Sequence, residues 1–309
     1  MIISLLFSLV SFGQASADED SLQSKKPFIV TLLGTGDPQP GVERFGPSIF
    51  VQAGNQSLLF DAGRGCLQRL RQLNQSYAKI DALFLTHLHS DHIVGLPDLW
   101  LTGWLISGRG SPLNIFGPKG TMEMINNLQK AFAFDIKIRV EDDKAPAEGS
   151  RLSVREIQQG TVYKKNGVTV IAFEVDHGPV KPAFGYRIEY NGHSIVLSGD
   201  TRYSENLIKF AKGVDLLVHE VVIAPDTLHR SDPKYPILAH HTTPEQASKV
   251  FNAVKPKLAV YSHIVKLYGQ DEQELFRRTR LDYTGPFVIG KDLMRFSITD
   301  TVSIISRQN

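Results

Sequence analysis

Short apolar runs separated by glycine-containing turns recur along the whole chain. Ala82–Leu85, Val214–Val218 and Leu258–Tyr261 have the length and composition of buried β-strands. The apolar runs on either side of Gly54-Asn55 and of Asn191-Gly192 predict two β-hairpins. Between these runs, stretches of helical periodicity place apolar residues on one face. This alternation of strands and helices predicts a layered α/β protein.

Three helices follow from the same pattern. After Asp61-Ala62-Gly63, helical spacing aligns four side chains: Cys66, Leu67, Leu70 and Leu73. A second helix is predicted over Thr121–Phe134. Thr243-Pro244-Glu245-Gln246 fits a capping box with proline at the first helical position, and the helix that it starts ends near Val254. Two segments are predicted as loops: Glu141–Ser150 and Ala224–Leu238.

The segment Thr86-His87-Leu88-His89-Ser90-Asp91-His92 carries four candidate metal ligands directly after the strand Ala82–Leu85. Because side chains alternate along a strand, His87 and His89 leave its end on the same side, and Asp91 and His92 turn around the start of a helix. Imidazole and carboxylate groups suit Zn²⁺, with Mn²⁺ or Fe as alternatives. The lack of a nearby cysteine argues against a closed structural zinc site.

Further polar residues follow other apolar strands: His177, Asp200, Glu220 and His263. Ligand sites of layered α/β proteins gather at strand ends, where loops supply the chemistry and strands supply rigidity. We therefore expect these residues to converge with the histidine-rich segment. The apolar segment Gly95–Trp104 holds both tryptophans and has two interpretations, either core packing or an apolar wall beside the metal that would suit an aromatic leaving group.

Composition describes a globular protein with a large core. The chain has 309 residues, of which 42% are hydrophobic and 21% charged, and its formal net charge is +2. This balance gives no strong nucleic-acid signature, because such binding relies on many Lys and Arg side chains, but it allows a small anionic ester as substrate. We expect one domain over residues 26–305, and a homodimer is one possible assembly.

The N-terminal residues 1–17 are uncharged, begin with an apolar run and end in Ala15-Ser16-Ala17 before an acidic stretch. They predict a signal peptide and export to the periplasm, although a basic n-region is missing. The run is too short to span a membrane. Cys66 is the only cysteine, so no internal disulfide can form, and the core and bound metal would have to stabilise an exported protein.

His87-x-His89-x-Asp91-His92, the lone His177, Ser198-Gly199-Asp200-Thr201 and His263 occur in an order that resembles the metallo-β-lactamase superfamily. The resemblance covers Phe28 to Thr299. It implies a four-layer αββα sandwich whose halves are related by a pseudo-two-fold axis. It also implies two Zn²⁺ ions, which share Asp200 and are otherwise held by two groups of ligands: His87, His89 and His177 for one, Asp91, His92 and His263 for the other.

The same resemblance implies that a hydroxide held between the metals attacks an ester, and that Asp91 orients this hydroxide. The carboxylate at the bridging position points to branches that cleave phosphate esters, sulfate esters or lactones. Leu33-Gly34-Thr35-Gly36, His219-Glu220 and His241-Thr242-Thr243 resemble ribonuclease Z, in which Glu220 and His241 would form a proton-donating pair.

Ribonuclease Z carries a long arm between the third and fourth motifs, whereas the interval from His177 to Asp200 is only 23 residues. Arg44–Ser48 and Pro97–Trp104 are similar to the zinc-dependent arylsulfatase-like group, which we therefore expect as the main assignment. The alternatives are a phosphodiesterase of the ribonuclease Z type that processes tRNA 3′ ends, and a lactonase or other carbon-ester hydrolase.

Overall fold

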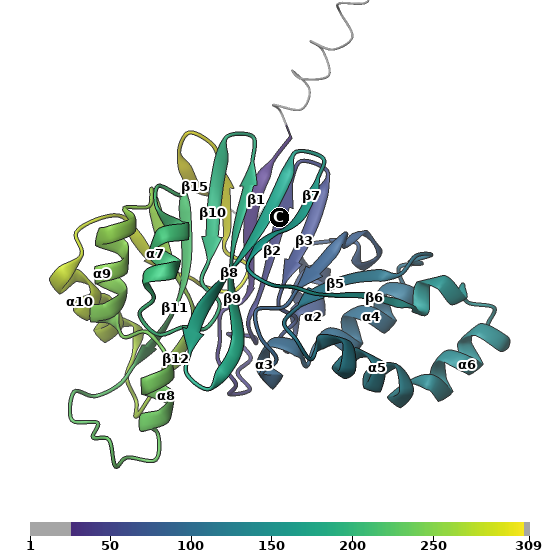
Figure 1. Ribbon diagram of the computed structural model, residues 1–309, viewed down its shortest axis with the longest axis horizontal. Helices are drawn as coiled ribbons and strands as arrows, with labels where there is room; N and C mark the ends of the chain where they lie inside the picture. Colours follow the sequence, from purple (N-terminus) through teal and green to yellow (C-terminus); the bar gives the residue numbers. More distant parts are fainter. Residues whose placement is uncertain (1–25, 306–309) are drawn as a thin grey trace, which may run out of the picture.

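Two β-sheets lie face to face, with helices on both outer surfaces (Figure 1). The computed structural model describes residues 26–305. The order of strands in the first sheet is β15 (Val302–Ile305), β14 (Arg295–Ile298), β1 (Phe28–Gly34), β2 (Ser48–Ala53), β3 (Gln56–Phe60), β4 (Ala82–Phe84), β5 (Leu113–Gly117) and β6 (Leu152–Glu156). The order in the second sheet is β13 (Phe287–Ile289), β12 (Leu258–Lys266), β11 (Leu216–Ile223), β10 (His193–Leu197), β9 (Val180–Tyr190), β8 (Val168–His177) and β7 (Gly160–Lys165).

The same strand pattern recurs in both sheets. In the first, the antiparallel strands β1, β2 and β3 are followed by the parallel strands β4, β5 and β6. In the second, the antiparallel strands β8, β9 and β10 are followed by the parallel strands β11, β12 and β13. The repeat agrees with the pseudo-two-fold relation that the sequence resemblance implied. The C-terminal ends of the parallel strands point to one edge of the sandwich, where loops can meet.

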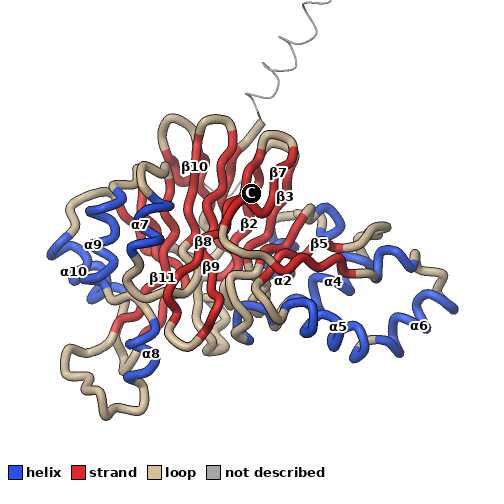
Figure 2. Tube along the Cα trace, in the orientation of Figure 1, coloured by secondary structure: helices blue, strands red, loops and turns tan. Residues whose placement is uncertain are grey.

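Helices form the two outer layers, as Figure 2 shows in blue. On the first half of the chain they are α2 (Cys66–Gln72), α3 (Ser90–Ile93), α4 (Leu96–Leu105), α5 (Thr121–Ala131) and α6 (Ala133–Glu141), with single 3-10 turns at Tyr77–Lys79 and Ala147–Ser150. On the second half they are α7 (Glu205–Ala211), α8 (Tyr235–His240), α9 (Pro244–Val254) and α10 (Glu272–Asp282). The αββα sandwich predicted from the sequence is confirmed.

The core lies in three apolar layers. Between the sheets, Phe60 and Phe84 stack at 4.9 Å, and Tyr186 from β9 packs against both rings. One outer layer packs α2, α4 and α5 on the first sheet, and the other packs α7, α9 and α10 on the second. Strands buried on both faces need apolar residues at nearly every position, which is why β4 and the first parts of β11 and β12, up to Val218 and Tyr261, are continuous apolar runs.

Several local predictions are confirmed. Asn191 and Gly192 both have positive φ and join β9 to β10, as a tight hairpin requires. Thr243 forms both hydrogen bonds of the capping box with Gln246 at the start of α9. Trp100 and Trp104 are fully buried, and their indole N–H groups donate to the carbonyls of Ser150 and Pro146. Both tryptophans therefore belong to the core, and the alternative that they form an apolar wall beside the metal is wrong.

Two other predictions need correction. The helix expected over Thr121–Phe134 ends at Ala131, because Phe132 has non-helical backbone angles, and a separate helix, α6, follows over Ala133–Glu141 up to the first residue of the expected loop. The loop expected over Ala224–Leu238 contains the start of α8. Both short helices carry no buried residues, so neither leaves the apolar periodicity by which helices are found in a sequence. Among the described residues, no helix is long and apolar enough to cross a membrane.

Candidate metal centre

The predicted ligands meet at the edge of the sandwich where the parallel strands end. His87 and His89 follow β4, and Asp91 and His92 lie on the four-residue helix α3. His177 is the last residue of β8, and Asp200 follows β10. Residues that are far apart in the sequence therefore converge, as the strand-end argument predicted.

Glu220 and His263 differ from that expectation, because they lie inside β11 and β12 instead of beyond their ends. The pairing of these strands shifts register between His219 and Val221, so that the single residue Glu220 faces both Ser262 and His263. His263 has a φ of 44°, which belongs to the left-handed region. A β-bulge changes the direction in which side chains point, and here it turns His263 toward the metal centre from within a strand that continues beyond it.

The first group of ligand atoms consists of three ring nitrogens and one carboxylate oxygen. His89 Nδ1 lies 3.0 Å from His87 Nε2 and 3.3 Å from His177 Nε2. Asp200 Oδ2 lies 3.8 Å from His87 Nε2 and 3.9 Å from His177 Nε2. All four ligand atoms lie within 4.8 Å of one another.

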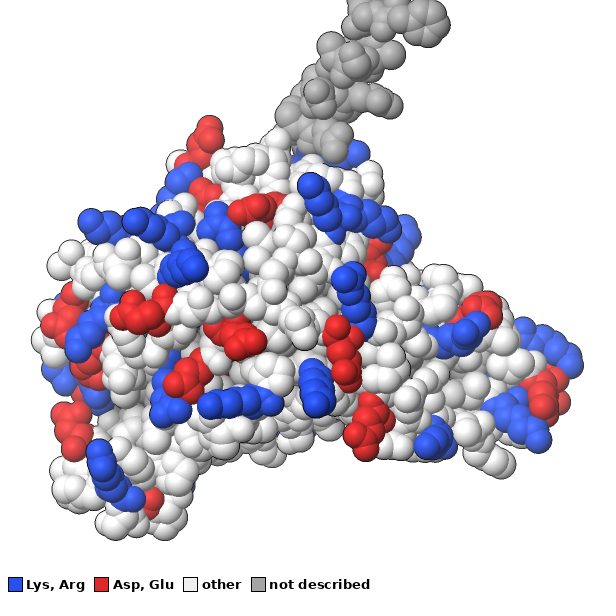
Figure 3. All heavy atoms as spheres, viewed as in Figure 1, with Lys and Arg blue, Asp and Glu red and all other residues white. Residues whose placement is uncertain are grey.

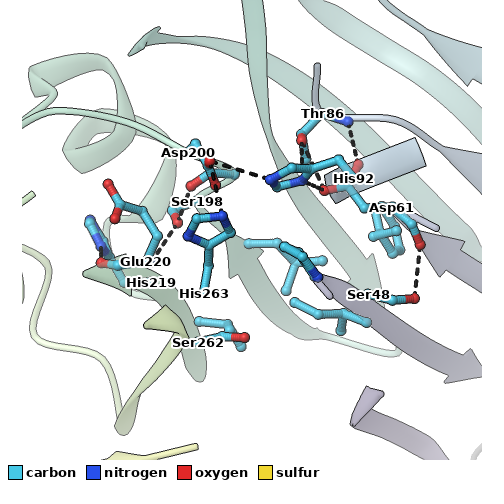
Figure 4. Close-up of a pocket in the computed structure, with 16 residues that line it drawn as sticks. Ser48, Asp61, Thr86, His92, Ser198, Asp200, His219, Glu220, Ser262 and His263 are labelled. Carbon is cyan, nitrogen blue, oxygen red and sulfur yellow. Dashed lines mark hydrogen bonds and ion pairs between the residues drawn. The ribbon is translucent and has the colours of Figure 1, made fainter. Parts of the chain in front are cut away.

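The second group of ligand atoms shares the same oxygen of Asp200. This Oδ2 lies 3.3 Å from His92 Nε2 and 3.2 Å from His263 Nε2 (Figure 4). Asp91 Oδ2 lies 3.5 Å from His92 Nε2 and 3.3 Å from His263 Nε2. Because Asp200 faces both groups, it occupies the position of a bridging ligand.

These spacings fit tetrahedral metal ions. With bonds of about 2.0–2.1 Å, a tetrahedral Zn²⁺ separates its ligand atoms by roughly 3.3–3.4 Å, close to the observed distances. His92 Nε2 is buried and has no hydrogen-bond partner in the described structure. A buried ring nitrogen aimed at two carboxylates and left without a hydrogen bond is the arrangement that a metal ligand shows. The residues present therefore fit two metal ions.

Asp61, just after β3, fixes the orientation of the histidines and was missed by the sequence analysis. Its Oδ1 accepts the Thr86 N–H at 2.8 Å, and its Oδ2 accepts the Thr86 hydroxyl at 2.9 Å and His92 Nδ1–H at 2.8 Å. Because a carboxylate only accepts, the Thr86 hydroxyl must donate to it and is free to accept from His87 Nδ1, 2.9 Å away. Both histidines then present Nε2 to the metal.

His177 is held in the same way from the other half of the chain. Its Nδ1 donates to the backbone carbonyl of His240 at 3.1 Å, which leaves Nε2 for the metal. Gly178 allows this approach, because a Cβ there would lie 2.6 Å from the His240 ring. The end of α8 thus lies directly against a metal ligand.

Electrostatics differ between the two groups of ligands. Burial, with the neighbouring His92, lowers the pKa of His87 well below its ordinary value, which favours the neutral form that binds metal. Burial also works against a charged His92, but Asp200 and Asp61 outweigh it and raise its pKa well above the ordinary value. Burial would raise the pKa of Asp200, but His263 and His92 hold it well below the usual range. Asp200 is therefore ionised, as a bridging ligand must be.

The buried Glu220 pairs with the partly buried His241 beside the ligands. Glu220 Oε2 lies 3.2 Å from His241 Nδ1, and Oε1 accepts the backbone N–H groups of Thr201 and Thr242. Burial lowers the pKa of His241, but the carboxylate of Glu220 outweighs it and raises the pKa to about 9. The His241 ring stacks on His263 with centroids 5.5 Å apart. The raised pKa favours the protonated form of His241, and its ring lies beside the candidate ligand His263.

A small cavity lies behind Asp200, between the two sheets (Figure 4). Ser48, Ser198 and Ser262 line it together with apolar side chains such as Phe60 and Val218. Ser48 and Ser198 donate to backbone carbonyls, so these two hydroxyls are already used within the protein. The ligands His92, Asp200 and His263 also line this cavity, whereas His89 is exposed to solvent.

Comparison with known proteins identifies the class. A model of the β-lactamase superfamily domain matches residues 56–264, which include the seven candidate ligands, Asp61, Glu220 and His241. The chain belongs to the β-lactamase superfamily, whose members with this fold and ligand set are metal-dependent hydrolases.

Its relatives include proteins named ribonuclease Z. The one from Mycobacterium bovis (strain BCG / Pasteur 1173P2) is 36% identical over 273 residues, which are 87% of this chain and 98% of that protein. The one from Mycolicibacterium gilvum (strain PYR-GCK) is 38% identical over 276 residues, 87% of this chain and 96% of that protein.

Solved structures show the same fold. The metallo-β-lactamase fold protein YhfI from Bacillus subtilis has a TM-score of 0.70 and 21% identity, covering 88% of this chain and 100% of that chain. The short form of human tRNase Z has a TM-score of 0.66 and 23% identity, covering 88% of this chain and 99% of that chain.

The short interval between His177 and Asp200 is therefore no longer an argument against the ribonuclease Z assignment. In the structure β8, β9 and β10 form two hairpins that fill this interval, so no arm is present there. The aligned residues make up 98% of the M. bovis relative, which leaves no room for a long arm in that protein either. The main reason for expecting an arylsulfatase is thus removed, and the comparisons favour the ribonuclease Z alternative.

Proposed function

We propose that this protein is a di-zinc phosphodiesterase of the ribonuclease Z type that cleaves RNA near a 3′ end. The observation that carries the proposal is the Glu220–His241 pair beside seven converging metal ligands, in a chain whose relatives at 36% and 38% identity are named ribonuclease Z. The sequence had assigned Glu220 and His241 to proton donation through the same resemblance.

Each part of the site has a role in such a reaction. The seven ligands would hold two metal ions, which supply Lewis acidity and a reactive water at neutral pH when bound. Asp91 faces both His92 and His263 and would orient the attacking water. Glu220 accepts from His241 Nδ1, so Nε2 is the atom that can donate a proton to the departing oxygen.

The geometry also explains why the ligand set leaves the ester class open. A sulfate monoester and a phosphodiester are both tetrahedral monoanions, so metals and Asp200 treat them alike. Proton donation by His241 matters most for an alcohol leaving group, such as the ribose oxygen of RNA, because an alkoxide is a poor leaving group. An aryl sulfate releases a stable phenolate and needs this help less.

A side-by-side comparison of substrates tests the proposal. Initial rates of zinc-loaded protein would be measured on an RNA with a 3′ extension, a bis-aryl phosphate, an aryl sulfate and a lactone. We expect turnover of both phosphodiesters and lower rates on the aryl sulfate and on the lactone. Faster turnover of the sulfate would instead support the arylsulfatase-like assignment, and faster turnover of the lactone the carbon-ester alternative.

His241→Ala tests the acid directly. The variant should keep both metals and lose about 10²- to 10⁴-fold in rate on a diester with a poorly acidic leaving group. The loss should shrink as the leaving group becomes more acidic, because a stable phenolate departs without a proton. A deficit that is the same across a series of substituted aryl diesters would assign His241 to substrate positioning instead.

The predicted signal peptide over residues 1–17 lies outside the described residues, so export and a periplasmic location remain predictions. A homodimer likewise remains a prediction. Assays on the purified protein do not depend on either.

A further inference from the structure

A polar groove borders the metal centre beside the β8–β9 hairpin. It is lined by the segment between β6 and β7, by the end of β8, by the start of β9 and by the start of α7. A second hollow runs along α5 and shares Lys119, Glu156 and Lys181 with the first. Because they share these three residues, the two hollows form one continuous depression, which we call the α5 groove.

The α5 groove touches the metal-binding segments at three points. Asp176 in its wall directly precedes the ligand His177. The N–H of Phe184, also in its wall, donates to the carbonyl of Thr86 at 2.9 Å, one residue before His87. A Cβ on Gly120 at the start of α5 would lie 3.3 Å from the side chain of Leu88. A substrate that extends from the metal centre on this side would therefore enter the groove.

Three exposed lysines line the groove, Lys119, Lys130 and Lys181. The lysines that form ion pairs within residues 26–305 are Lys137, Lys165 and Lys257, so the three groove ammonium groups are unpaired there. On the face shown in Figure 3, Lys and Arg side chains stand among Asp and Glu side chains instead of forming a field of one sign. Any attraction for an anion must therefore be local to the groove.

Acidic side chains also face the groove, but two of the four are already engaged. Glu156 accepts the N–H groups of Gly120 at 2.8 Å and Met122 at 3.1 Å, at the start of α5. Asp176 pairs with Arg202 at 2.9 Å. Glu123 and Glu174 remain. Glu156 keeps its charge at the start of α5, where the helix dipole offsets part of it. None of the three ammonium groups forms an ion pair with these carboxylates among the described residues, so each is available to an anion, and amide side chains line the spaces between them.

We propose that the α5 groove holds the phosphate backbone of the RNA strand whose scissile bond lies at the metal centre, with Lys119 and Lys181 on its phosphates. This inference rests on the proposed function. Lysine contacts to phosphate position a strand without reading its sequence, and amides such as Gln158 and Asn126 can donate to sugar and phosphate oxygens. A bis-aryl phosphate is too short to leave the metal centre, so it would not use these lysines.

Alanine variants of Lys119 and Lys181, single and combined, test the groove. Each should lower kcat/KM on RNA about 5-fold, mainly through KM, as loss of one phosphate contact predicts. The slope of log kcat/KM against log salt should fall by about 0.7 for each lysine removed. Rates on the bis-aryl phosphate should stay unchanged. Lys249→Ala, an exposed lysine on α9 outside the groove, is the matched control and should behave as wild type.

The outcomes separate the two proposals. If RNA is cleaved and the double variant matches wild type in KM and salt slope, the groove assignment is overturned while the proposed function stands. If RNA is not cleaved at all, the proposed function fails, and fluorescence anisotropy of a short labelled RNA then measures binding directly. In that case, binding lost in the double variant but kept in Lys249→Ala supports the groove, and equal binding in all variants overturns it.

Discussion

Replacing Asp61 by Asn exchanges one carboxylate oxygen for an amide N–H₂ at a position where both oxygens are in use. Oδ1 accepts from Thr86 N–H, and Oδ2 accepts from the Thr86 hydroxyl and from His92 Nδ1. If the amide oxygen keeps the Thr86 N–H, the N–H₂ group faces His92 Nδ1 and forces the ring proton onto Nε2, the atom that faces Asp200. If the amide is reversed, its N–H₂ meets the Thr86 N–H. Neither orientation satisfies all the donors.

Two magnitudes follow from this conflict. Loss of an outer partner of a metal ligand typically costs 10- to 100-fold in metal affinity, which is about 1.4–2.7 kcal/mol. In the metal-free protein, loss of a hydrogen bond to a buried charged group costs about 1.5–3 kcal/mol of unfolding free energy. We therefore expect Asp61→Asn to weaken zinc binding at least about 10-fold and also to lower the stability of the metal-free chain.

Competition with a chromophoric zinc chelator would give the affinities, and denaturant unfolding in the presence of EDTA would give the metal-free stabilities. Asp215→Asn is the matched control, because Asp215 is also buried and accepts from a backbone N–H, that of Ser194, but lies directly before β11, at the end of the strand away from the metal centre. The control should lose stability and keep its zinc affinity. Equal zinc affinities in the wild type and in Asp61→Asn would refute the tautomer argument and leave Asp61 a purely structural residue.

Two further predictions concern the bridge and the opposite end of the sandwich. Purified protein expressed with zinc should carry close to two ions per chain by elemental analysis. Asp200→Ala should lower both this occupancy and the melting temperature, because Asp200 faces both ligand groups and bound metal stabilises the folded state by mass action. Unchanged occupancy would show that Asp200 is not a bridging ligand. Burial would raise the pKa of Asp215, but Lys257 at 2.6 Å and the Ser194 N–H lower it. Its contribution to stability should thus be complete above its ordinary pKa of about 3.9 and be lost as the pH falls through the lower folded value. The stability difference between metal-free wild type and Asp215→Asn should stay constant from neutral pH to about pH 5 and shrink below about pH 4, and a difference that grows on acidification would contradict this sign.

The ligands could be predicted from the sequence because their signals are local. His87, His89, Asp91 and His92 lie within one turn after a strand, and their spacing alone places four donors on one side. The αββα arrangement was implied by the resemblance to the superfamily, but the apolar runs alone predicted several of its strands, since strands buried on both faces stay largely apolar. These features depend on the residues nearest in the chain.

Features that depend on distant contacts could not be predicted. Asp61 looks like an ordinary turn residue before Ala-Gly, and its role exists only because β3 and β4 pair in parallel and bring it to Thr86. The bulge at His263 arises from pairing between β11 and β12, which no local pattern shows. The tryptophans of α4 could not be assigned for a related reason. Apolar residues that line a metal site and apolar residues of a core are of the same types in the sequence, and only the packing in the folded chain distinguishes them.

The segment from Ala224 to His241 links proton donation to metal binding. Its last two residues supply the His240 carbonyl that orients the ligand His177 and the His241 ring that pairs with Glu220. The Tyr268 hydroxyl donates to Asp232 at 2.7 Å, and Arg278 donates to the carbonyl of Ala224 at 2.7 Å, so the segment is held at both its start and its middle. A displacement of this segment would move the acid and release the metal ligand together. Asp61 has no such link to His241, because it follows a strand of the first sheet and contacts His92 and Thr86 there, whereas the segment lies against the second sheet. Substitutions at Asp61 and in the segment from Ala224 to His241 should therefore have different effects. A change at Asp61 should alter metal affinity alone. A change in the segment should alter both metal affinity and the dependence of the rate on the leaving group.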